Sequence, residues 1–257
     1  MNGRKRAKAR ARRWGVLCLG LAVLSALAAA VSGFGHRLAV WDYSLGFSIL
    51  RWAAYVGLGA AAVSACVWLY AVLRRAWLGL GLAGLALVIG VATAGMPWRY
   101  LQQARAVPPI NDITTDTESP PEFVDILPLR AGAGAPSEYG GARVAARQRE
   151  AYPELGSVSY PLPPDQAFER AVAVARDLGW TIVAAAPAEG RIEATDQTFW
   201  FGFTDDIVIR IRNDPAGCLV DLRSASRMGV SDLGVNAARV QAFIDKLIEG
   251  SRAQGTR

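Results

Sequence analysis

Three long apolar stretches dominate the first hundred residues of the sequence. They cover residues 16–34, 53–73 and 76–96, and none of them contains a charged side chain. About 20 apolar residues in a helix are enough to cross the ~30 Å hydrocarbon core of a bilayer. The pattern therefore predicts three transmembrane helices. Only Arg74 and Arg75 separate the second stretch from the third, so these two should form a tight antiparallel hairpin whose many small residues let the backbones approach closely.

Beyond residue 136 the pattern changes to the short segments of a folded domain. Apolar residues at helical spacing predict helices over 164–178 and 233–248, and a shorter helix is expected within 137–150. Strands are predicted at 158–162, 180–185 and 191–195, with an aromatic strand or bulged strand at 199–203 and a hairpin of 206–212 and 219–225. This order predicts an α+β domain, in which an antiparallel sheet of four to five strands carries the helices on one face.

The last hairpin allows a prediction of its two faces. Every second residue of its first strand is an isoleucine, namely Ile207, Ile209 and Ile211. Side chains alternate across a strand, so these three should lie on the apolar face. The register that suits both strands places Arg210 opposite Asp221 and Val208 opposite Arg223. The other face should therefore carry arginine and aspartate side chains.

These elements divide the chain into five parts. A basic tail (1–13) precedes the three-helix region (14–97), and an extended segment rich in Pro, Thr and Asp (98–130) leads into the α+β domain (131–250). Residues 251–257 form a C-terminal tail.

The positive charges predict how the chain is oriented. Seven of the first 13 residues are basic and none is acidic, and Arg74 and Arg75 lie two crossings later. The positive-inside bias places both in the cytoplasm, so the domain beyond residue 97 should be periplasmic, anchored in a bacterial inner membrane. The first stretch could instead be a cleaved signal peptide, because residues 26–28 resemble a cleavage site. We expect an uncleaved helix, since two further spans follow at once.

The net charge of +6 does not indicate a nucleic-acid partner. Residues 106–257 contain 15 basic and 21 acidic side chains, a net charge of −6, so the excess positive charge flanks the membrane segments. The basic tail is expected to contact anionic lipids of the bilayer. An envelope protein is a further candidate partner.

The polar face of the hairpin and the segment that follows it are the candidate ligand-binding region. One interpretation is a set of cross-strand salt bridges on a solvated face. The other is an anion-binding face, because guanidinium groups present planar donors to carboxylate or phosphate. The candidate residues are Arg210, Arg223, Ser226, Arg227, Asp232, Asn236 and Arg239. Asp232 weakens the second interpretation, since it can cap the following helix and repel an anion.

Signatures of an enzyme are sparse. The only histidine is His36, so the α+β domain cannot build a Ser-His-Asp triad or a histidine-based metal site. Cys218 is expected to be a buried hydrophobe rather than a nucleophile. Clustered carboxylates are the secondary candidates, and they are Asp112, Asp116, Asp205 and Asp206. They could perform acid–base chemistry in an envelope hydrolase or transferase. We expect no metal centre and no cofactor.

Three motifs carry a resemblance to a known family. They are NDITTD at 111–116, WFGFTDD at 200–206, and DLRSASR at 221–227 continued by SDLGVN at 231–236. Over roughly residues 106–250 the chain resembles a bacterial domain-of-unknown-function family, number 1499. The resemblance implies a domain boundary and an exported or membrane setting, but no catalytic residue. We therefore predict a membrane-anchored extracytoplasmic binding or assembly module of the cell envelope, with the carboxylate-dependent enzyme as the alternative.

Overall fold

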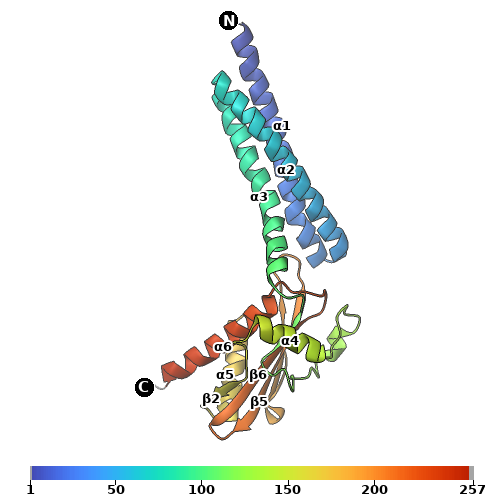
Figure 1. Cartoon of the computed structure of the whole chain (residues 1–257), viewed down its shortest axis with the longest axis vertical. Helices are drawn as coiled ribbons and strands as arrows, with labels where there is room; N and C mark the ends of the chain where they lie inside the picture. The colour runs from blue at the N-terminus through green and yellow to red at the C-terminus, as the bar shows by residue number, and fades with distance from the viewer. Residues whose placement is uncertain (1, 255–257) are drawn as a thin grey trace. The chain divides into compact units, whose positions relative to one another are not determined.

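The computed structural model describes residues 2–254 and divides into two compact units. One unit, called here the helical unit, comprises Met1–Gln102 together with Phe199–Gly202. The other, the sheet unit, comprises Gln103–Thr198 and Phe203–Arg257. Figure 1 shows the long helices of the first and the twisted sheet of the second.

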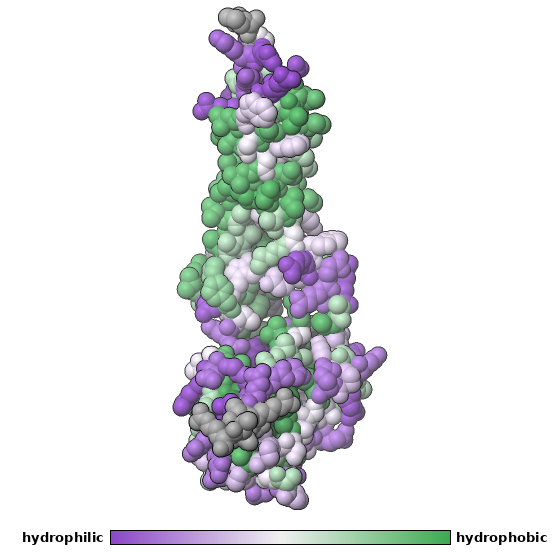
Figure 2. Space-filling view, turned by 90° about the vertical axis from the view of Figure 1, so that its left-hand side faces the viewer, coloured by the Kyte–Doolittle hydropathy of each residue, from purple (hydrophilic) through white to green (hydrophobic). Residues whose placement is uncertain are grey.

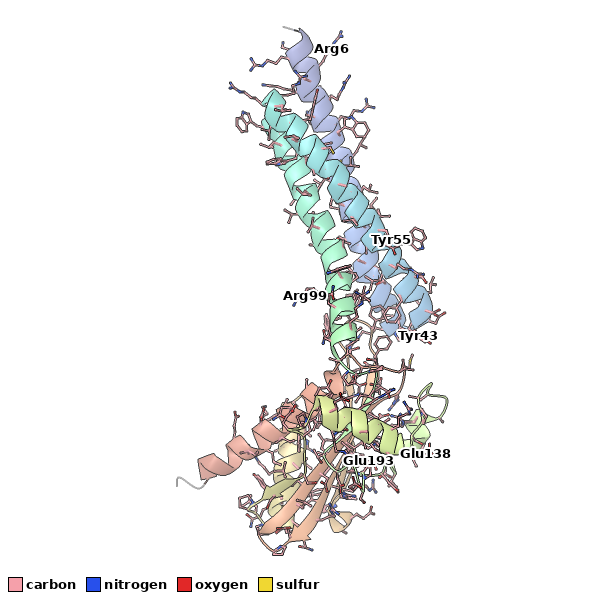
Figure 3. All side chains as sticks on the ribbon, in the orientation of Figure 1. Arg6, Tyr43, Tyr55, Arg99, Glu138 and Glu193 are labelled. Carbon is pink, nitrogen blue, oxygen red and sulfur yellow. The ribbon has the colours of Figure 1, made fainter. Side chains whose placement is uncertain are left out.

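The helical unit contains the three predicted membrane helices. They are α1 (Asn2–Arg37), α2 (Tyr43–Arg74) and α3 (Trp77–Ala106). Each is long and apolar enough to cross a membrane. Their large apolar side chains are mostly exposed, which suits helices that face lipid rather than water, and Figure 2 shows an apolar band along them that gives way to polar residues at the N-terminal end. Arg6 and Arg99 lie toward opposite ends of this unit (Figure 3).

Close backbone packing joins α2 to α3, as the small residues predict. A Cβ atom on Gly90 would lie 2.5 Å from the carbonyl oxygen of Gly57, so no larger residue fits there without a shift of the backbone. The turn between the helices is short because Arg75 ends α2 in the left-handed conformation, at φ 49°. In Figure 1 this turn lies toward the same end of the unit as the basic tail.

The sheet unit has six strands rather than the four to five predicted. They are β1 (Asp112–Thr114), β2 (Val158–Tyr160), β3 (Thr181–Ala186), β4 (Arg191–Gln197), β5 (Thr204–Asp214) and β6 (Gly217–Ser226). The antiparallel order is β1-β6-β5-β4-β3, and β2 also pairs with β6. The additional strand, β1, lies in the extended entry segment, where three residues are too few to show a period.

The helices of the sheet unit pack on one face of the sheet, which confirms the predicted α+β arrangement. They are α4 (Gly141–Ala151), α5 (Pro164–Asp177) and α6 (Val235–Gln254). Two short 3-10 helices, η1 (Leu127–Arg130) and η2 (Pro187–Glu189), lie in the connecting segments. The three isoleucines of β5 are buried with side chains of α5 and α6, such as Phe168 and Val240. Of the predicted tail 251–257, α6 takes up residues to Gln254, and 255–257 lie outside the described residues.

The register of the β5–β6 hairpin is the predicted one. Arg210 pairs with Asp221, and Val208 pairs with Arg223. This register puts polar residues of β4, β5, β6 and β1 together on the face that the helices leave open.

The prediction of an aromatic strand at 199–203 is wrong. These residues form a loop between β4 and β5, closed by a hydrogen bond from the backbone N–H of Thr198 to the carbonyl oxygen of Phe203. Gly202 has a positive φ of 68°, which a strand does not allow. Phe199 is 79% exposed, so it does not belong to the core of the domain.

Candidate functional site

The polar face of the sheet is only partly solvated, whereas the first interpretation of its charges placed the whole face in solvent. Residues 115–139, called here the strap, cover it. The carboxylate of Glu193 on β4 accepts hydrogen bonds of 2.7 Å from the backbone N–H groups of Val124 and Ile126, which fixes the strap to the sheet. Ile126 is also buried against Val208 of β5. The ion pair of Arg223 in the middle of this face is therefore enclosed between two layers, whereas the side chain of Arg212 stays 43% exposed.

Arg223 lies at the centre of the covered face. Its side chain is 2% exposed and holds Asp112 in a bidentate pair at 2.9 and 2.8 Å. The remaining donors reach the carbonyl oxygens of Ser137 and Pro121 in the strap, and the guanidinium lies 4.7 Å from the ring centroid of Phe123. These contacts connect β6, which carries Arg223, with β1 and with the strap.

A second cluster joins two arginines to one aspartate. Asp206 of β5 is fully buried, and it accepts from Arg130 at 2.6 Å and from Arg227 at 2.8 Å. Arg130 also donates to the carbonyl oxygens of Pro136 and Ser226. Arg130 is nearly inaccessible, whereas the side chain of Arg227 is 22% exposed. This cluster contains one more positive charge than negative charge.

A third cluster lies further along the β5–β6 hairpin and is balanced in charge. Arg210 and Arg212 both bind Asp221, at 2.9 and 2.7 Å, and both also bind Asp116 of the strap. Arg210 lines a hollow of about 350 Å³ that it shares with Arg191 and with Glu122 and Glu189. Because these acidic side chains offset the arginines, the surroundings of Arg210 are poorly suited to an anion.

The other predicted residues lie on the opposite, helix-covered face of the sheet. Arg239 of α6 binds Asp205 and Asp196, each at 2.8 Å, and donates to Ser224. Asn236 connects to this network by donating to Ser226 at 3.0 Å. These side chains are buried except for the partly exposed Asp196.

Asp232 caps α6. Helix capping is one of the two roles predicted for this residue, and ligand binding is the other. Its carboxylate accepts from the backbone N–H groups of Gly234 and Asn236 at 2.9 and 2.6 Å. Burial raises the pKa of Asp232 above its ordinary value, although these two hydrogen bonds oppose the shift. A further negative charge close to this carboxylate would be unfavourable.

The candidate residues therefore do not form one surface. Arg210, Arg223 and Arg227 lie on the strap face, whereas Ser226, Asp232, Asn236 and Arg239 lie at the beginning of α6 on the other face. Neighbours in a strand point to opposite sides, which separates residues adjacent in the sequence. Arg227 combines exposure with local excess positive charge.

The carboxylate candidates are likewise separated and paired. Asp205 and Asp206 point to opposite faces of β5 and bind different arginines, while Asp112 binds Arg223 and Asp116 binds Arg210. Among residues 2–254 no group of three or more His, Cys, Asp or Glu side chains is arranged to hold a metal ion. Cys218 is buried, and burial raises the pKa of its thiol.

Two important residues of the strap face were missed by the sequence patterns. Arg130 follows a Leu-Pro-Leu run and precedes a Gly/Ala-rich stretch, with no periodicity to connect it with Asp206. Glu193 lies within the predicted strand 191–195, and its buried polar side chain opposite Val208 is the signal that a further segment covers this face.

The sheet unit coincides with a region shared by other proteins. A family model described as "Protein of unknown function (DUF1499)" matches residues 112–247. The chain belongs to this family. The match begins with β1 and ends within α6, so the DUF1499 region contains every cluster described above but none of the membrane helices. A search of curated proteins finds no match.

Proposed function

We propose that this chain is a membrane-tethered, non-enzymatic binding or assembly module of the bacterial cell envelope. Its DUF1499 domain recognises an anionic group, carboxylate or phosphate, of a ligand or protein partner at Arg227. The observation that carries the proposal is the sharing of one buried carboxylate, that of Asp206, by two guanidinium groups, of which one is accessible.

The side chains near Arg227 carry more positive than negative charge. Arg130 and Arg223 both lie against the ring of Phe123, at 5.3 and 4.7 Å from its centroid. Together with Arg227 they place three guanidinium groups near two carboxylates, those of Asp112 and Asp206. An exposed guanidinium next to such an excess is a suitable partner for an anion.

Hydrogen bonds of its backbone also hold Arg227 in place. Its N–H donates to the carbonyl oxygen of Thr204 and its own carbonyl accepts from the N–H of Ala135, both at 3.0 Å. Two side-chain nitrogens, Nε and Nη2, are fixed on Asp206. A side chain ordered in this way loses little conformational entropy on binding.

The proposal includes an orientation. The basic tail and the Arg75 turn lie toward one end of the helical unit, which supports a cytoplasmic N-terminus by the positive-inside rule. Three crossings then put the DUF1499 domain on the periplasmic side of the inner membrane.

Alkaline phosphatase fused after Arg257 tests this orientation. The enzyme folds only after export, so the fusion is expected to be active, whereas a cytoplasmic reporter at the same position should be inactive. An inactive phosphatase beside an active cytoplasmic reporter would reverse the orientation.

Phosphate binding by the full-length protein in detergent micelles tests Arg227. Inorganic phosphate at ten times its dissociation constant should stabilise the domain by about 1.4 kcal/mol, a rise of a few degrees in melting temperature. Arg227→Ala should abolish this rise in melting temperature, because it removes the guanidinium group that binds phosphate. The variant should still fold, because Asp206 keeps its ion pair with Arg130. Arg212→Ala is the matched control, since Arg212 is 43% exposed but lies in the balanced cluster. Equal responses of the two variants to phosphate, with chloride at the same ionic strength as reference, would refute the assignment.

A further inference from the structure

The loop between β4 and β5 is built into the helical unit rather than the sheet unit. Three hydrogen bonds hold Phe199–Gly202 on the end of α1. The indole Nε1 of Trp200 donates to the carbonyl oxygen of Ala30 at 2.8 Å. Arg37 Nη1 donates to the carbonyl oxygen of Phe199 at 2.7 Å, and His36 Nδ1 donates to that of Phe201 at 2.6 Å. The loop therefore has a defined position on this helix.

A glycine of α1 makes room for the loop. A Cβ atom on Gly33 would lie 2.5 Å from Cδ1 of Trp200, a distance that real Cβ contacts do not reach. Gly20, on the same helix, has no neighbour within 4 Å of such a Cβ atom. Any side chain at position 33 must therefore displace Trp200, while position 20 tolerates one.

Phe199, the exposed residue of the loop, contacts α1 where the helix changes from apolar to polar residues. Phe199 contacts Phe34 edge to face, with ring centroids 5.6 Å apart. Phe34 is the last residue of the first apolar stretch, and the polar His36 and Arg37 follow it. A helix that crosses a bilayer places such a change at the level of the lipid headgroups.

Other aromatic residues of the helical unit gather at the same end. Trp41 donates its indole N–H to the carbonyl oxygen of Ser32 at 3.0 Å, and Tyr43 begins α2. Tryptophan and tyrosine are enriched where a membrane protein meets the headgroups. Phe199 contacts Phe34 at this end of α1 and remains 79% exposed, so the lipid itself offers its ring an apolar environment.

We propose that Phe199 inserts into the membrane interface and that Phe199–Gly202 is a lipid anchor, held on α1 by Trp200. The partner is the lipid surface at the boundary between headgroups and acyl chains. This gives a function to the part of the WFGF motif that the sheet does not use, and it does not depend on anion binding at Arg227.

Fluorescence quenching in lipid vesicles tests the anchor. The full-length protein, with the exposed Cys66 replaced by alanine, is labelled with an environment-sensitive fluorophore at Phe199→Cys and reconstituted into phosphatidylethanolamine–phosphatidylglycerol vesicles. Lipids with a nitroxide near the top of the acyl chain should quench this label. The references are Leu24→Cys, exposed in the middle of the apolar stretch, which a deep nitroxide should quench, and Lys5→Cys in the basic tail, which neither should quench.

The glycine pair provides the matched control. Added to the labelled Phe199→Cys protein, Gly33→Ala should cause loss of quenching because it displaces Trp200, whereas Gly20→Ala should leave quenching unchanged. Quenching of the Phe199 label no stronger than that at position 5 would overturn the proposal. A label that is shielded from water but insensitive to the nitroxide lipids would also overturn it, and would indicate a protein partner instead.

Discussion

Replacement of Arg223 by alanine is expected to lower the free energy of unfolding of the DUF1499 domain by about 3–5 kcal/mol. The reason is the carboxylate that remains. Asp112 is buried and loses the bidentate partner that compensates its charge. The strap also loses the two donors that reach the carbonyl oxygens of Ser137 and Pro121. The urea midpoint of the full-length protein in micelles, followed by pulse proteolysis of the domain, measures this change.

Two variants separate the lost ion pair from other effects. Arg212→Ala removes a partly exposed guanidinium and leaves Asp221 paired with Arg210, so it should cost no more than about 1 kcal/mol. Replacing both Arg223 and Asp112 by apolar residues of similar volume should restore much of the stability, because no unpaired charge is then buried. If Arg223→Ala were as stable as Arg212→Ala, the enclosed pair would not brace the strap.

Replacement of Ile209 by aspartate should cost about 4 kcal/mol or more and leave little folded domain. Ile209 is fully buried on the helix-covered face, where it pairs with Leu222 of β6 and Ile192 of β4. A carboxylate there has no cationic partner within the apolar core formed with α5 and α6. Thermal unfolding of the full-length variant, compared with the parent, measures the loss.

Ile209→Val is the control for this position. It removes one methylene group and should cost about 0.5–1.5 kcal/mol, as for other buried isoleucines. An Ile209→Asp domain that melted within a degree or two of the parent would contradict the assignment of the two sheet faces.

Large losses of stability in both Arg223→Ala and Ile209→Asp are expected of a domain that has a polar core on one side of its sheet and an apolar core on the other. Buried ion pairs add little net stability compared with apolar packing, but they penalise every arrangement that leaves a charge unpaired. The strap contains only one short 3-10 helix of its own, so these pairs and the carboxylate of Glu193 position it. An accessible arginine such as Arg227 is then held on a rigid support.

The sequence by itself determined the features that depend on local periodicity. The three apolar stretches specify membrane helices, because their length and lack of charge suffice for a bilayer crossing. The alternation in β5 and β6 specifies their register, since a slip of one residue would move every isoleucine to the polar face. The order of helices and strands likewise specifies the α+β domain.

Only the tertiary structure decided how the candidate site is arranged. Arg223 and Asp112 are 111 residues apart in the chain, and Arg130 and Asp206 are 76 apart, so no local pattern connects them. The strap has no period that would predict the face it covers. The aromatic loop shows the same limit: its alternation is that of a strand, but its side chains pack against α1, more than 160 residues earlier. Residue spacing encodes the direction of each side chain within an element, whereas burial and pairing depend on which distant segments meet.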